Sequence, residues 1–389
     1  MELYDAPESV MGDAAELLPL LSQSERRVLG AVWRNGPVPR SDIAEQTGLA
    51  DASVTRLARE LQQRGFVSDS VRREGARGQP TRPLELKPDG AYAFGVNFSH
   101  SYIDLALVNL AGEPVATERR RLDRASPERI AEIAAETLQE QLVSTGVALE
   151  KVIGAGFSLP GDFLETPHFL HAHAAFPELR GRDLSAIFRV AMPVPVCVEN
   201  DGTSAALGER VHGIGRKVNS FLFLHIGHGV GAGLIIDGRP WRGARGNSGT
   251  IGVMYPNSEP RPSGQDLFET LRAEGVAIDD FDALDSIEPQ ECPPLRRWLV
   301  RAGEQLRLAV HVTSRVMDPA LVIVGGRLPP KITEALAAAI DGDAAFAPSR
   351  VLPYPRLVAS TLGPYAGAIG AASVCFYRAF LASDASEIT

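Results

Sequence analysis

Apolar residues recur at helical spacing in the first part of the chain. Residues 24–36 predict one helix, with Ser24 as its N-cap and Gly36 at its end. The inward face of this helix would consist of Val28, Leu29, Val32 and Trp33. Residues 40–48 predict a second, shorter helix that also ends in a glycine. The pattern therefore indicates two helices joined by a short turn.

A third helix and a β-hairpin follow. Residues 49–66 predict a helix with Asp51 as its cap. Its apolar face would consist of Val54, Leu57, Ala58 and Leu61. Residues 67–88 alternate apolar and polar side chains on both sides of a basic tip at 75–79, which is typical of a hairpin. Three helices and a hairpin in this order predict a winged helix-turn-helix.

The outer face of the third helix suits double-stranded DNA. Short polar side chains at its start can approach base edges in the major groove, and arginines can meet phosphates or guanine. The predicted DNA contacts are Ser41, Ala52, Ser53, Thr55, Arg56, Arg59, Arg77 and Gln79. As an alternative, Arg56 and Arg59 form only a solvated face. The order of turn, helix and wing favours DNA.

Strands alternate with helices beyond residues 86–92, which predicts an α/β body. Residues 96–114 and 224–240 share one pattern: a strand, a turn of small residues, an apolar strand and Gly-x-Pro. This repeat predicts two similar lobes facing each other across a cleft. Further helices are predicted at 126–145, 204–213, 295–317 and 364–382. The predicted division is a flexible arm over 1–21, the winged helix over 22–88 and the body over 92–382.

Charge separates the two parts of the chain. Residues 22–88 hold 12 Lys or Arg against 8 Asp or Glu, a net charge of +4. The remaining residues hold 27 against 40, a net charge of −13. A small basic module on an acidic body fits DNA binding by the module alone.

Composition predicts a cytoplasmic protein without a membrane segment. The longest apolar runs fall far short of the roughly 20 residues that cross a bilayer, and the acidic start lacks the order of a secretion signal. Cys197, Cys292 and Cys375 are odd in number and widely spaced, so we expect reduced thiols rather than disulfides or a metal knuckle.

Four stretches resemble the ROK family, named for repressors, open reading frames and sugar kinases, and specifically its winged-helix repressor branch. They are GARGQPTRPLEL at 75–86, GFSLPG at 156–161, ENDGTSAALGE at 199–209 and GHGVGAGLIIDGRPWRGARGNSG at 227–249. The resemblance spans nearly the whole chain. It implies an α/β fold in which an N-terminal winged helix-turn-helix precedes a two-lobed actin-like, sugar-kinase domain.

The phosphate-binding residues of ROK kinases are changed in this chain. The family pattern of Asp, two glycines and Thr is replaced by Asn97, Ser99, His100 and Ser101. Losing the Asp removes a charge that would organise magnesium, and side chains stand where phosphate needs bare backbone. The glycines at 227–233 and 325–326 are interpreted as inherited fold. We therefore expect no cofactor and no enzyme activity.

The family's zinc motif is also missing. Thr250 and Val253 occupy the positions of its Glu and His, and no cysteine occurs between 198 and 291. Four zinc ligands cannot be assembled from that stretch. His171 and His173 have no companion acid nearby in the sequence, so no other metal site is predicted.

In the family, the Asn and Asp of the END segment bind sugar hydroxyls, and Asn200 and Asp201 remain here. A carboxylate accepts from adjacent hydroxyls, and an amide can donate as well as accept. The resemblance implies a sugar or sugar derivative as effector, bound by Asn200, Asp201, Thr250, His173 and Glu269.

The predicted function is a sequence-specific DNA-binding regulator that represses carbohydrate uptake or catabolism genes. Its partners would be operator DNA, the effector and further copies of itself, as a homodimer or homotetramer. One alternative is an ATP-dependent sugar kinase with an extra domain, in which Asp201 is the general base. Another is a regulator whose body serves only as an oligomerisation scaffold.

Overall fold

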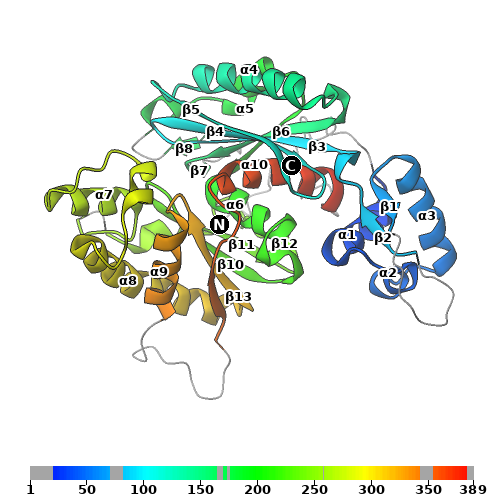
Figure 1. The fold of residues 1–389 in the computed structure, drawn as a ribbon. Helices are drawn as coiled ribbons and strands as arrows, with labels where there is room; N and C mark the ends of the chain where they lie inside the picture. The colour runs from blue at the N-terminus through cyan, green and yellow to red at the C-terminus, as the bar shows by residue number, and fades with distance from the viewer. Residues whose placement is uncertain are drawn as a thin grey trace, which may run out of the picture.

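The computed structural model shows a small N-terminal module beside a two-lobed body (Figure 1). The structure describes residues 21–70, 82–163, 170–172, 176–256, 258–341 and 354–382. Three predicted site residues, Arg77, Gln79 and His173, lie outside the described residues.

The N-terminal module has the predicted order of elements. It consists of α1 (Gln23–Asn35), α2 (Arg40–Thr47), α3 (Asp51–Gln63), β1 (Val67–Asp69) and β2 (Leu84–Leu86). The two strands pair antiparallel, with Val67 opposite Leu86. The predicted apolar faces of α1 and α3 are buried.

Two predicted helix caps were wrong by one or two positions. The N-cap of α1 is Ser22, whose hydroxyl accepts from the Glu25 amide while the Glu25 carboxylate accepts from the Ser22 amide. Ser22 has an acid three residues later in the helix and Ser24 does not, so Ser22 rather than Ser24 is the N-cap. In α3 the N-cap is Ala50, and Asp51 is the first helical residue. An acid at that position still interacts favourably with the helix dipole.

The first lobe is a five-stranded sheet in the order β5-β4-β3-β6-β9. The strands are β3 (Tyr92–Phe98), β4 (Tyr102–Asn109), β5 (Pro114–Arg121), β6 (Val152–Leu159) and β9 (Val196–Asn200). The helices α4 (Pro127–Thr145) and α5 (Leu184–Ala191) cover its outer face (Figure 1).

The second lobe repeats this topology in the order β12-β11-β10-β13-β14. Its strands are β10 (Phe221–Ile226), β11 (Val230–Ile236), β12 (Arg239–Pro240), β13 (Leu321–Gly326) and β14 (Arg356–Ala359). The outer helices are α7 (Gly264–Ala273), α8 (Pro293–Met317) and α9 (Pro330–Asp341). In both sheets an antiparallel meander is followed by two parallel strands. The internal repeat predicted from the sequence is therefore present as two matching lobes.

Two helices lie between the sheets: α6 (Asp201–Val211) and α10 (Ala366–Phe376). α10 packs on the first sheet, α6 packs on β10 and β11, and the two helices pack on each other. The close approach of α6 to β11 requires glycine: a Cβ at Gly233 would stand 2.1 Å from the Gly202 carbonyl oxygen. Gly233 of β11 thus allows the helix to pack closely on the strand.

Short elements complete the described fold. The strands β7 (Gly161–Phe163) and β8 (Leu170–Ala172) form a small separate hairpin. The 3₁₀ turns are Pro88–Gly90, Leu149–Lys151, Pro177–Leu179, Ile214–Lys217, Ile251–Met254 and Phe281–Ser286, and a π-helical turn at Tyr377–Leu381 extends α10. Across the described ranges, no helix has the length and apolarity needed to cross a membrane.

The winged helix is joined to the body by a continuous apolar core. Trp33 of α1 is 2% exposed and packs against Phe376 and Phe380 at the end of α10. Its indole Nε1 donates to the carbonyl oxygen of Val211, the last residue of α6, at 3.0 Å. Phe66, which precedes the wing, also meets Phe380 edge-on. The winged helix is therefore in direct contact with both helices that lie between the lobes, α6 and α10.

Candidate ligand cleft and nucleic-acid interface

A cavity of about 360 Å³ opens between the two lobes. Its walls come from the β7–β8 hairpin of the first lobe, the start of α6, and the β10–β11 turn and residues 249–253 of the second lobe. Three predicted effector residues line it together: Asn200, Asp201 and Thr250. A monosaccharide fits a volume of this order, since small-molecule sites begin at roughly 300 Å³.

The start of α6 orients Asn200 and Asp201. Asn200 is the N-cap, and its side-chain oxygen accepts from the Thr203 amide at 2.7 Å. This contact leaves its NH₂ group as the donor that a ligand can use. Asp201 accepts from the Gly202 amide at 2.8 Å through Oδ1, and its Oδ2 lies 3.4 Å from His225 Nε2.

The pKa of Asp201 lies below the ordinary value for an aspartate. Burial by itself would raise this pKa, but the charges of His225 and Arg327 and the Gly202 amide outweigh it. Asp201 is therefore a carboxylate at neutral pH. With its side chain still 30% exposed, it can accept hydrogen bonds from ligand hydroxyls.

An ion pair behind the cleft holds the END segment in place. Glu199 is 2% exposed, and its Oε2 accepts from Arg242 Nε at 2.9 Å, while its Oε1 accepts from the Asn200 amide at 3.1 Å. Arg242 belongs to the loop that leads to Thr250. The same pair thus ties the loop of the second lobe to the residues that begin α6.

Thr250 connects the two sides of the cleft. Its hydroxyl lies 3.0 Å from Asp162 Oδ1 in the first lobe and 2.8 Å from the Asn247 carbonyl oxygen. Sequence reasoning missed Asp162, which stands one residue after the quoted GFSLPG stretch. It also missed further cleft residues, namely His171, Arg180, His225, His228, Arg261 and Arg327. His225 and His228 lie beside or within the stretch at 227–249, and Arg327 follows the glycine pair at 325–326, which is the signal that could have found them. The other three stand apart from the family stretches.

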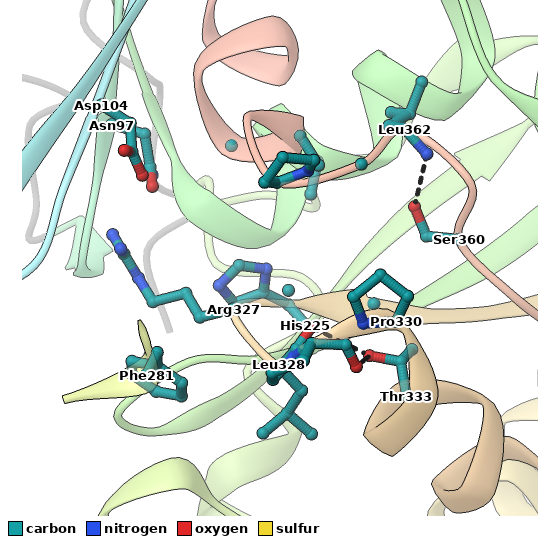
Figure 2. Close-up of a pocket in the computed structure, with 18 of the residues that line it drawn as sticks. Asn97, Asp104, His225, Phe281, Arg327, Leu328, Pro330, Thr333, Ser360 and Leu362 are labelled. Carbon is teal, nitrogen blue, oxygen red and sulfur yellow. Dashed lines mark hydrogen bonds between the residues drawn. The ribbon is translucent and has the colours of Figure 1, made fainter. Parts of the chain in front are cut away.

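On the other side of His225 and Arg327 lies a second cavity of only about 90 Å³, lined by Asn97 of the first lobe and by the glycines at 325–326 of the second. His225 and Arg327 line both cavities. Figure 2 shows Arg327 extending from the second lobe toward Asn97 and Asp104 of the first. Its guanidinium donates to the Phe98 carbonyl oxygen and to the Tyr102 hydroxyl. Arg327 thus spans the space between the lobes.

The two turns that would hold phosphates carry histidines that meet each other. His100 Nδ1 and His228 Nε2 lie 2.8 Å apart, one from each lobe. In such a contact one ring nitrogen donates and the other accepts. Arg119 of β5 adds a second bridge, to Asp104 at 2.6 Å and to Asp282 of the second lobe. The lobes are thus bridged at the β3–β4 and β10–β11 turns and through Arg119.

Glu269 does not reach the cleft. It lies on the exposed face of α7 and accepts from the Gln265 side chain at 3.1 Å. Arg261, just before α7, lines the cavity instead. The described residues contain no group of three or more His, Cys, Asp or Glu placed to hold a metal ion. The three cysteines are free thiols, with Cys197 and Cys375 buried.

The predicted DNA-contact residues that the structure describes lie on one module and face outward. Ala52, Arg56 and Arg59 of α3 are exposed, Ser53 and Thr55 are half-buried, and Ser41 of α2 is exposed. Arg56 Nη1 forms a salt bridge with Glu60 at 2.7 Å, one helical turn on. Arg40 bonds Asp69 at 2.7 Å and so fixes α2 against the wing. The outer face of α3 is therefore free of the module's own core.

Comparison with known proteins identifies the relatives of the chain. The ROK family model matches residues 93–269, and the MarR family model matches residues 21–72. The Sinorhizobium fredii protein y4fQ is 41% identical over 365 residues, covering 94% of this chain and 93% of that protein. The chain belongs to the ROK family.

Named relatives of this ROK protein include regulators and kinases. The xylose repressor of Bacillus subtilis is 25% identical over 62% of either chain, so the match leaves out more than a third of each. A ROK family transcriptional regulator, a homologue of the Escherichia coli Mlc protein, superposes with a TM-score of 0.63 at 20% identity over 92% of this chain and 97% of that one. The ROK hexokinase of Thermus thermophilus superposes with a TM-score of 0.55 at 23% identity, over 72% and 97%.

These matches confirm the predicted family and the predicted α/β architecture of a winged helix followed by a two-lobed actin-like domain. They also agree with the expectation of a regulator, since the relatives that match include proteins named as repressors. The kinases among the structural neighbours share the fold of the body.

Proposed function

We propose that this ROK protein is a DNA-binding transcriptional regulator that represses carbohydrate uptake or catabolism genes and responds to a sugar derivative in the interlobe cleft. The observation that carries the proposal is the course of α6. This helix begins at Asp201 in the cleft and ends at Val211, whose carbonyl oxygen accepts from Trp33 of the winged helix. One rigid element thus touches both the ligand site and the DNA-binding module.

The coupling needs only a ligand that prefers one position of α6. An effector shifts a two-state equilibrium by its differential affinity for the two states. The 11 residues of α6 span about 16 Å, and a helix of that length transmits a tilt or shift to its far end. Movement at Val211 would change the position of Trp33 and hence of α3. In a paired regulator this alters the spacing of the two recognition helices.

We propose that the chain does not act as a sugar kinase. A cavity of about 90 Å³ is too small for a nucleotide, and the His100–His228 contact and Arg327 occupy the space between the lobes. Asn97 supplies no charge for magnesium. Asp201 then serves as a ligand-binding carboxylate rather than a general base.

We infer a homodimer or homotetramer, since reading two half-sites takes two winged helices. Leu308, Val312 and Val316 support this inference. They stand at four-residue spacing on α8 and are 46%, 45% and 82% exposed. An apolar stripe of this kind is typical of a subunit contact. We also propose a cytoplasmic location, because a DNA-binding regulator must reach the chromosome.

The proposal is tested by measuring DNA affinity for the region upstream of the protein's own gene at several salt concentrations. Salt-sensitive binding that weakens when a sugar derivative is added supports it. Arg56→Ala should lose DNA affinity and keep ligand affinity, and Asp201→Asn should do the reverse. A protein that binds no DNA but releases ADP from ATP with a sugar acceptor would overturn the proposal.

A further inference from the structure

The charges that line the ligand cleft are unbalanced. Three arginines line it, Arg180, Arg261 and Arg327, together with the histidines His171, His225 and His228. The carboxylates on its wall are Asp162 and Asp201. The lining therefore carries three arginines against two carboxylates, an excess of one positive charge before any charge on the histidines is counted. A neutral sugar does not require such an excess.

The carboxylates of the cleft already have partners on the protein. Asp201 lies beside His225 and accepts from the Gly202 amide. Asp162 lies 3.0 Å from the Thr250 hydroxyl. Among the residues that the structure describes, neither Arg180 nor Arg261 forms a salt bridge with either carboxylate. The arginines are therefore not neutralised by the acids beside them.

Arg180 and Arg261 contact only backbone oxygen among the described residues. Arg180 Nε donates to the Ala172 carbonyl at 3.3 Å. Arg261 donates to the Tyr255 carbonyl through Nε at 3.1 Å and Nη2 at 2.7 Å. Each guanidinium has five N–H donors, so several remain for a ligand. Elsewhere at the lobe interface, Arg119 and Arg242 are paired with carboxylates.

We propose that the effector is a monosaccharide bearing a negatively charged group, a carboxylate or a phosphate. Asn200 and Asp201 would bind its hydroxyls, and Arg180 and Arg261 its anionic group. The planar donor fork of arginine matches both carboxylate and phosphate, which it binds through two parallel hydrogen bonds. The inference rests on the proposed function, because it names the ligand class of the same cleft.

The geometry explains how one site takes both parts of such a ligand. Asn200 and Asp201 stand where β9 meets the start of α6. Arg180 instead follows the 3₁₀ turn at 177–179 of the first lobe, and Arg261 precedes α7 of the second. An anionic group that meets both arginines would therefore contact both lobes. Binding would favour one lobe arrangement, which is what a regulatory ligand must do.

The test is calorimetric titration of the full chain with matched probes: glucose, gluconate, glucuronate, glucose 6-phosphate and inorganic phosphate. We expect an acidic derivative to bind at least tenfold more tightly than glucose, with affinity that falls as salt rises. The gluconate and glucuronate arms distinguish a carboxylate from the phosphate of glucose 6-phosphate. Inorganic phosphate binding as tightly as the acidic sugar would overturn the inference, since the hydroxyl contacts would then contribute nothing.

Two variants locate the anion. Arg180→Gln and Arg261→Gln should each weaken binding of the acidic sugar on the order of 10- to 100-fold, the range for a lost hydrogen bond to a charged group. Arg296→Gln on exposed α8 is the matched control and should change nothing. Unchanged affinity in both cleft variants, or no binding of any acidic probe, overturns the inference. If glucose itself binds and releases DNA, the inference fails while the proposed function stands.

Discussion

Trp33→Phe should uncouple the DNA-binding module from the ligand cleft. The substitution keeps an aromatic ring in the core beside Phe376 but removes the indole N–H that donates to Val211 at 3.0 Å. Trp33 is 2% exposed, so the Val211 carbonyl loses its partner in a buried place. Leaving a buried polar group unsatisfied costs about 1–3 kcal/mol.

That cost is comparable to the whole coupling free energy of a typical allosteric protein, about 1–3 kcal/mol or 5- to 150-fold in affinity. Because the contact joins α6 to α1, its loss should reduce the ligand-induced change in DNA affinity to less than about twofold. DNA affinity without ligand should stay close to that of the wild type, since α3 is untouched.

The assay is fluorescence anisotropy of labelled operator DNA with and without saturating ligand. Trp298→Phe is the matched control: it removes an indole donor, to Asp266 at 2.8 Å, from a residue only 1% exposed on α8 of the second lobe. Both variants should lose stability, but only Trp33→Phe should lose coupling. Full coupling in Trp33→Phe, or equal loss in both variants, would refute the role given to α6.

Three further predictions concern the other surfaces. Arg56→Ala should weaken DNA binding by about 1–3 kcal/mol if the side chain meets guanine, and by less if it meets a phosphate, which a base-substitution series of the operator distinguishes. Ligand affinity measured by calorimetry should not change. Because the pKa of Asp201 is depressed from 3.8, its stabilising contribution is present above about pH 4 and is lost as pH falls through its folded-state pKa. The stability difference between wild type and Asp201→Asn in chemical denaturation should shrink from pH 5 to 3, and a growing difference would contradict the sign. Val312→Glu on the α8 stripe should lower the oligomeric mass in light scattering; an unchanged mass would locate the subunit contact elsewhere.

The fold was predicted from the periodic spacing of apolar residues along the chain. The inward residues of α1 and α3 and the two hairpins of the body follow local patterns that the chain repeats, and the structure has them in those places. The predicted N-cap of α1 was wrong because Ser22 and Ser24 are both residue types that suit an N-cap. The hydrogen bonds between Ser22 and Glu25 decide between them. Such a competition depends on hydrogen-bond geometry, which residue types alone do not specify.

The cleft was only partly predictable. Asn200, Asp201 and Thr250 lie together in it, as the family motifs imply. Glu269 faces solvent instead. The sequence could not show this, because the rotation of α7 about its axis cannot be inferred from a loosely aligned segment. Arg180 and Arg261 stand in irregular backbone, where no repeat predicts the direction of a side chain.

The contact between His100 and His228 joins residues 128 positions apart, and the contact between Trp33 and Val211 joins residues 178 apart. Each depends on how lobes and modules pack, and no local pattern records it. These long-range contacts are the ones on which regulation depends. The sequence alone therefore predicts the parts of the regulator but not how they are connected.

The central claim is that occupancy of the interlobe cleft changes the affinity of the winged helix for DNA. The most direct measurement is the dissociation constant for the upstream DNA of the protein's own gene, titrated with an acidic sugar, for wild type and Asp201→Asn. We predict that the ligand shifts the wild-type constant 5-fold or more, on the scale of typical allosteric coupling, and leaves the Asp201→Asn constant unchanged at equal starting affinity. An identical ligand response in both proteins, or DNA binding that no sugar derivative alters, would contradict the claim.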